Sequence, residues 1–123
     1  MFLGKKTFGD FLGSPERIST SVLTSRLDLL KSHQIIDFVL DLKDKKVKRY
    51  YLTDKGIDLF PVMYEMFYWS MRNFNTGLIL RPNGFASHLQ KDSDKKGVKG
   101  MSSDQVINEA QKKYLKIRSS ILN

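Results

Sequence analysis

The spacing of hydrophobic positions between residues 18 and 53 changes once, near Ile35. Before that point Leu23, Leu27 and Leu30 recur at the intervals that line one face of a helix. Ser19 stands at the expected N-cap, where its hydroxyl can accept a hydrogen bond from an amide of the first turn. The pattern predicts a helix over about residues 19–32.

After Ile35 the period shortens to two, which is typical of strands. Apolar residues alternate from Ile36 to Leu42, as expected of a half-buried strand, and a second strand is predicted over Val47–Leu52. The segment Lys43–Arg49 between and within them is rich in cations. A helix, a hairpin and a cationic tip together predict a winged helix-turn-helix. The expected fold class is α+β and mainly α, with a two-stranded wing and additional dimerisation helices.

Short helices are predicted on either side of this unit. Thr7 can cap a first helix that carries Phe8, Phe11 and Leu12, and the sequence Gly-Ser-Pro at 13–15 ends it. After the hairpin, Thr53 can cap a helix that is apolar almost all the way round, in which Pro61 should introduce a kink or end the first segment. Such a helix requires burial on more than one side. It could be the core helix of a monomer, but we favour a dimer interface formed by Phe60, Met63, Tyr64, Phe67, Tyr68 and Met71.

The remainder of the chain is interpreted as a connector and a last helix. Residues 75–100 are expected to form the connector, mobile in part and with one helical turn near 85–89. Residues 101–123 are expected to form an amphipathic helix, capped by Ser102 or Ser103, that docks on its own domain or on its dimer mate. Its apolar positions Val106, Tyr114 and Ile117 are added to the predicted interface. Residues 1–74 then form the DNA-binding domain together with the start of the dimerisation region.

Charge favours a polyanionic partner. The 123 residues carry a net charge of +8, and the positive excess lies in residues 1–53 and 84–123. Small hydroxyl side chains at the start of a helix can approach bases and phosphates without steric bulk. A hydroxyl-rich or lysine-rich face alone would indicate only a solvated surface; the combination predicts double-stranded DNA as the partner. The candidate DNA-binding residues are Lys5, Lys6, Ser19, Thr20, Ser21, Thr24, Ser25, Arg26, Lys43, Lys45, Lys46, Lys48 and Arg49.

Other classes of protein are not favoured. The chain has no cysteine, and His33 and His88 stand far apart, so no metal or cofactor is expected. Its acidic residues are dispersed and no catalytic motif occurs, so we predict that it is not an enzyme. No apolar run is long enough to span a bilayer and no secretion signal is visible, so a cytoplasmic protein is expected.

Three segments, Leu23–Lys31, Tyr50–Gly56 and Leu59–Trp69, resemble the HxlR-type transcriptional regulators within the MarR-like winged-helix group. The resemblance covers about residues 2–74. It implies a homodimeric DNA-binding regulator whose helix from about 19 to 32 lies in the major groove and whose wing, residues 43–49, contacts the backbone. Helices outside the winged unit would build the dimer.

The chain departs from the family pattern at several points. We expect it to start within or just after the family's additional N-terminal helix, and it lacks the cysteine that often precedes that helix. Gln34 stands where the family usually has glycine, and the hairpin lacks the common proline. Residues 75–123 extend beyond the typical end of the family. We hypothesise that a helix at 103–121 covers core surface left open by the shortened N-terminus.

Two alternatives stay open. The first is a winged-helix module for protein interaction or dimerisation that does not bind DNA. The second adds an unidentified small-molecule effector to the DNA-binding role. In that case the cluster Tyr64, Phe67, Tyr68 and Trp69 would line its pocket, although such clusters more commonly form interface core.

Overall fold

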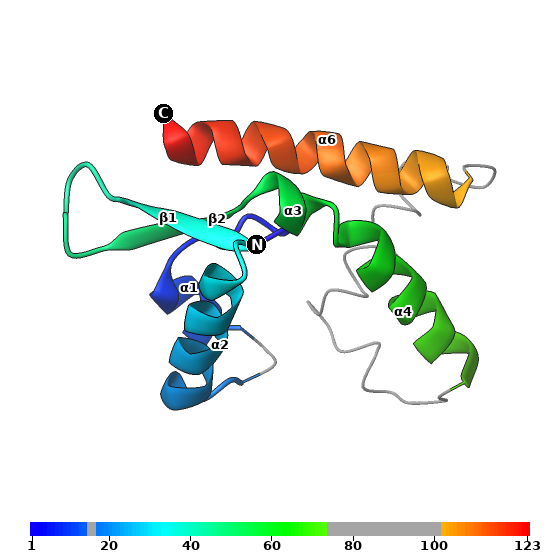
Figure 1. The fold of residues 1–123 in the computed structure, drawn as a ribbon, viewed down its shortest axis with the longest axis horizontal. Helices are drawn as coiled ribbons and strands as arrows, with labels where there is room; N and C mark the ends of the chain where they lie inside the picture. The colour runs from blue at the N-terminus through cyan, green and yellow to red at the C-terminus, as the bar shows by residue number, and fades with distance from the viewer. Residues whose placement is uncertain (15–16, 74–101) are drawn as a thin grey trace.

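The computed structural model describes residues 1–14, 17–73 and 102–123, and of residues 71 and 72 it describes the backbone alone (Figure 1). The connector predicted over 75–100, with its helical turn, lies outside the described residues. The elements are α1 (Phe8–Leu12), α2 (Thr20–Ser32), β1 (Ile36–Leu40), β2 (Lys48–Leu52), α3 (Asp54–Ile57), α4 (Phe60–Asn73) and α6 (Ser103–Leu122). The described part is mainly helical with a two-stranded antiparallel hairpin, which confirms the predicted winged helix-turn-helix.

Both ends of α2 are fixed by local hydrogen bonds. At the start, the hydroxyl of Ser19 accepts a hydrogen bond from the Val22 amide, as predicted. At the end, the Gln34 amide donates to the Lys31 carbonyl and the next amide donates to the Leu30 carbonyl. This termination requires a left-handed backbone at Gln34, whose φ is 58°. Glycine adopts a left-handed backbone without steric cost, which explains why the family that the sequence resembles usually has glycine at this position.

The hairpin pairs Ile36 with Leu52 and Leu40 with Lys48. Its strands are shorter than the sequence pattern suggests, because Asp41 starts a turn. The carboxylate of Asp41 accepts hydrogen bonds from the amides of Lys43 and Asp44, at 2.8 and 3.2 Å. The predicted strand positions at 41–42 and 47 therefore belong to the connecting loop. We call the hairpin the wing and residues 41–47 the wing tip.

The outer edge of β2 is covered by two distant segments. The Tyr50 amide donates to the Lys6 carbonyl at 2.6 Å, and Thr7 forms a bridge with Arg49. Further along, the Leu52 amide donates to the Tyr114 hydroxyl of α6 at 2.7 Å. The Tyr50 and Leu52 amides of this edge are thus paired without a third long strand.

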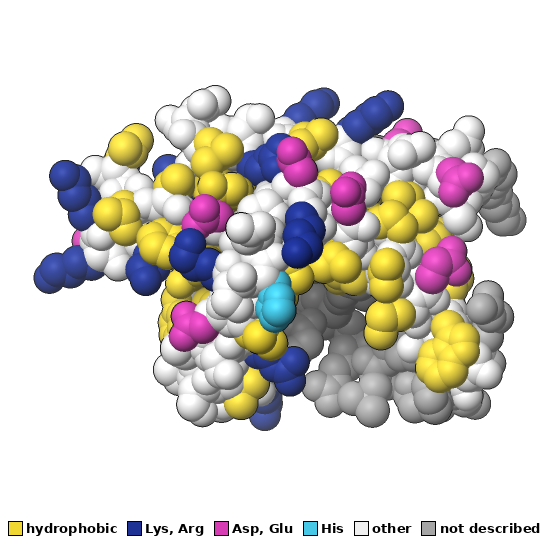
Figure 2. Space-filling model, viewed as in Figure 1, with side chains coloured by type: hydrophobic (Ala, Val, Ile, Leu, Met, Phe, Trp, Pro, Cys, Tyr) yellow, Lys and Arg dark blue, Asp and Glu magenta, His cyan; other side chains and the backbone are white. Residues whose placement is uncertain are grey.

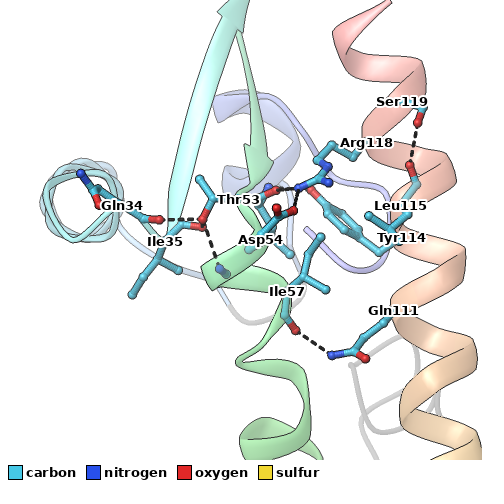
Figure 3. Close-up of polar contacts among 12 residues, drawn as sticks. Gln34, Ile35, Thr53, Asp54, Ile57, Gln111, Tyr114, Leu115, Arg118 and Ser119 are labelled. Carbon is cyan, nitrogen blue, oxygen red and sulfur yellow. Dashed lines mark hydrogen bonds and ion pairs between the residues drawn. The ribbon is translucent and has the colours of Figure 1, made fainter.

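The segment after the wing forms two helices. Thr53 caps α3, as predicted, and its hydroxyl also donates to the Gln34 carbonyl at 2.6 Å (Figure 3). Gly56 brings α3 against the Ile35 backbone so closely that a Cβ at this position would lie 2.1 Å from the carbonyl oxygen. The predicted interruption falls between Ile57 and Phe60, and Pro61 lies in the first turn of α4, where a missing amide hydrogen has no cost.

The C-terminal helix α6 docks on its own chain and runs along β2 and α3 (Figure 1). Tyr114 is 1% exposed and joins Leu23, Leu27, Ile36, Leu52 and Ile57 in the core. Phe2 packs between the rings of Tyr114 and Phe60, with centroid distances of 5.1 and 4.8 Å. Polar contacts reinforce the packing: Arg118 donates to Asp54 at 2.7 Å, and Gln111 donates to the Ile57 carbonyl at 3.2 Å (Figure 3). No described helix is long and apolar enough to cross a bilayer.

Candidate nucleic-acid interface

The hydroxyl groups at the start of α2 are not equivalent. The Ser19 hydroxyl is occupied by the helix cap, and the Thr24 hydroxyl donates to the Thr20 carbonyl at 2.9 Å. Ser25 and Arg26 are exposed. Ser21 is exposed as well, with its oxygen 3.5 Å from that of Ser19. Thr20 is exposed too, and only its backbone carbonyl takes part in these bonds. Of the six residues predicted on this helix and its cap, Thr20, Ser21, Ser25 and Arg26 are therefore the best placed to contact a partner.

Three lysines project from the wing tip. Lys43, Lys45 and Lys46 are exposed, and Lys and Arg side chains gather at this end of the molecule (Figure 2). The tip itself is held by its acidic residues, since Asp41 and Asp44 accept hydrogen bonds from backbone amides of the loop. Those bonds from the Lys43 and Asp44 amides lower the pKa of Asp41, with a smaller effect from the charge of Arg49. A structured loop thus presents the lysines.

Lys48 belongs to the strand rather than to the tip. Its ammonium lies 4.5 Å from the centroid of the Phe38 ring, while Lys31 of α2 lies 5.0 Å from the same ring. Lys31 also pairs with Asp37 at 2.7 Å, and this hydrogen bond lowers the pKa of the Asp37 carboxyl. These contacts connect the end of α2 to the wing, so that the two predicted binding elements are held together.

Arg49 is used differently from the lysines. Its side chain is 16% exposed, its Nε lies 3.5 Å from an Asp41 carboxylate oxygen, and one of its Nη atoms donates to the Ile121 carbonyl at 3.1 Å. The guanidinium therefore joins the wing, close to its tip, to the end of α6. Sequence reasoning grouped Arg49 with the DNA-binding cations, because a contact across 72 positions leaves no local signal.

The lysines ahead of α1 lie near the wing as well. Lys6 is half-buried and its carbonyl pairs with β2, while the Lys5 ammonium donates to the Ser14 hydroxyl. Their position beside β2 is compatible with phosphate contacts flanking the wing.

The residues predicted for a dimer interface divide into two sets. Phe60, Tyr64 and Tyr114 are 1%, 4% and 1% exposed and are covered within one chain. Burial also raises the pKa of Tyr64 to about 12. Phe67, Val106 and Ile117 are half-buried, Met63 and Tyr68 are 40% and 39% exposed, and the Met71 side chain lies outside the described part.

Three exposed apolar residues of α4 were left out of the predicted interface. Val62, Met66 and Trp69 are 54%, 64% and 52% exposed and follow one another at helical spacing. We call these three residues, with Met63, the α4 face. A shallow depression lies beside it, lined by Glu65, Met66, Trp69 and Ser70. The apolar spacing of these residues is visible in the sequence. Because α4 is apolar on nearly every side, however, the sequence does not show which side the rest of the chain covers.

The aromatic side chains of α4 pack largely against one another. The rings of Tyr64 and Tyr68 lie 4.7 Å apart and those of Phe67 and Tyr68 lie 5.3 Å apart. Mutual packing of this kind is characteristic of a hydrophobic cluster.

A helix-turn-helix with a capped second helix, a lysine-tipped hairpin and flanking helices defines the winged-helix class of proteins. The HxlR-like helix-turn-helix family model matches residues 1–77, and the chain belongs to that family of DNA-binding transcriptional regulators. No match was found among curated proteins or among solved structures.

Proposed function

We propose that this protein is a homodimeric, sequence-specific transcriptional regulator that places α2 in the major groove of duplex DNA and its wing on the adjacent backbone. One observation carries the proposal. The exposed lysines of the wing tip are held on the same rigid unit as the exposed start of α2, through the shared core of Leu27, Ile36 and Leu52.

The two elements would have different roles. Lys43, Lys45 and Lys46 would neutralise phosphates, which provides affinity without sequence preference. Ser21, Ser25 and Arg26 would reach base edges, because the major groove admits a helix and displays a distinct pattern of donors and acceptors for each base pair. Lys5 and Lys6 would add backbone contacts ahead of α1.

The α4 face supports the dimer. It exposes apolar side chains at successive turns of one helix, and a second copy of the chain would remove them from water. A two-fold axis through this face would generate two copies of α2, and in this class of complexes these lie about 34 Å apart, one turn of DNA. The expected operator is therefore an inverted repeat.

Selection of binding sites from random duplex DNA tests the function, its symmetry and the half-site spacing together. We expect enrichment of an inverted repeat. If the protein retains no duplex even in dilute buffer, DNA binding is contradicted, and the alternative of a winged-helix protein-interaction module is favoured.

Salt dependence tests the wing. Replacing Lys45 and Lys46 together by alanine should reduce the slope of log affinity against log salt by up to about two, because each phosphate contact contributes about 0.9. The matched control replaces Lys112 and Lys116, which are exposed residues of α6, and so removes the same charge from a helix that lies apart from α2 (Figure 1). Equal slopes for the wing variant and the native protein would show that the wing does not lie on the backbone.

A further inference from the structure

An apolar side chain interrupts the polar surface at the start of α2. Val22 is 44% exposed, whereas its neighbour Leu23 is 5% exposed and forms part of the core. Ser25 and Arg26, at three and four positions further along the chain, are its neighbours on the helix surface. Val22 is therefore displayed within the set of residues proposed to reach base edges, although it has no polar group with which to read them.

The major groove offers one kind of apolar group to such a side chain. Among the four bases, only thymine presents a methyl group at this edge, at C5. Two of the hydroxyls at the start of α2 are already used inside the helix, those of Ser19 and Thr24. Fewer hydroxyl groups are thus free to form hydrogen bonds with bases than the sequence suggests. An apolar contact from Val22 would therefore contribute a larger share of the base recognition by α2.

Building on the proposed function, we infer that Val22 contacts the 5-methyl group of a thymine in each half-site and so determines a preference for thymine at that position. The β-branched side chain suits this role, because it has one strongly preferred rotamer in a helix and holds its methyl groups in a fixed direction. The contact would exclude water from both apolar groups and would favour thymine over cytosine, which lacks the methyl group and offers an amino donor instead.

The test uses the full chain and the duplex enriched from random DNA. Each thymine of one half-site is replaced in turn by deoxyuridine, which removes the methyl group and leaves base pairing intact. We expect the native protein to lose about fourfold in affinity at one position, the effect of one buried methyl-sized group. The variant Val22→Ala loses the contact in both half-sites, so it should bind the thymine duplex about sixteenfold more weakly than the native protein does, and it should not distinguish the thymine duplex from the uridine duplex.

Leu29→Ala is the matched control. Leu29 is also an exposed apolar residue of α2, at 52%, but it lies seven residues further from the N-terminal end. This variant should retain the native response to deoxyuridine. Both substitutions are at exposed positions and favour the helix or leave it unchanged, so thermal unfolding should show an intact fold for each.

The possible results separate this inference from the proposed function. If no duplex is enriched, the proposed function fails and the inference fails with it. If a duplex is enriched but the native protein is indifferent to deoxyuridine throughout, the inference alone is wrong. The same holds if Val22→Ala responds to deoxyuridine as strongly as the native protein does.

Discussion

Helices α4 and α6 both carry apolar surface and both flank the winged unit, yet they use their apolar surfaces in opposite ways. α6 contributes Tyr114 and Ile121 to the buried core and is joined to β2 and α3 by hydrogen bonds from Arg118 and Gln111. α4 buries Phe60 and Tyr64 near its start and leaves the α4 face in contact with solvent. α6 thus stabilises its own chain, whereas α4 leaves an apolar surface available for assembly.

The largest effect on folding should come from Tyr114→Ala. The change removes a fully buried ring and also the hydroxyl that accepts a hydrogen bond from the Leu52 amide. We expect the free energy of unfolding to fall by about 3 to 5 kcal/mol, as measured by denaturant titration at fixed protein concentration.

Leu115→Ala is the control for this prediction, since Leu115 is 41% exposed on the next position of the same helix. It should change stability by less than about 0.5 kcal/mol. Equal losses for Tyr114→Ala and Leu115→Ala would mean that α6 contributes through its helical structure and not through its docking.

A smaller effect of opposite sign is expected within the winged unit. Gln34 has a left-handed backbone, which a side chain disfavours, so Gln34→Gly should raise the free energy of unfolding by about 1 kcal/mol. The hydrogen bond from Thr53 is retained because it ends on the backbone carbonyl of Gln34. Thermal unfolding measures the shift, and a lower melting temperature would contradict the backbone argument. His33→Gly is the control. His33 has a φ of −89°, which any residue adopts readily, so glycine relieves no strain there and this variant should be less stable than the native protein.

The smallest effect on the fold, with the clearest effect on assembly, should come from Met66→Glu on the α4 face. Met66 is 64% exposed, so the substitution should leave the circular dichroism spectrum unchanged. A buried, unpaired carboxylate at a two-fold interface is costly, so the mass in solution should fall from two chains to one. Light scattering after size-exclusion chromatography measures this. Glu65→Gln, at a neighbouring exposed position, should keep the native mass, and a Met66→Glu variant that keeps it too would place the dimer contact elsewhere.

Much of the winged unit can be predicted from local sequence, because its signals are local. The Ser19 cap, the leucine spacing of α2 and the change of period after Ile35 act over a few residues, and the structure has the corresponding elements at nearly the predicted bounds. Strand length was overestimated because the side chain of Asp41 competes with the strand ladder for backbone amides. Turn chemistry of this kind ends a strand even where the apolar alternation continues.

The use of individual side chains was harder to predict, since it depends on contacts between distant segments. Tyr114 was expected between two chains but lies in the core of one, because its hydroxyl and ring fit the exposed edge of β2. Arg49 was expected to face a partner but lies against the end of α6. Within α4, nothing in the pattern showed which turns α6 and Phe2 would cover.

The position of Arg49 has an electrostatic consequence. Its positive charge sits beside the Asp41 carboxylate and at the carbonyl end of α6, where the helix dipole is negative, so little of that charge is seen at a distance. The potential around the hairpin therefore originates toward its far end, in Lys43, Lys45 and Lys46 together with Lys48 at the start of β2. With a Debye length of about 8 Å at physiological ionic strength, an approaching polyanion would be attracted toward one end of the ribbon instead of along its length.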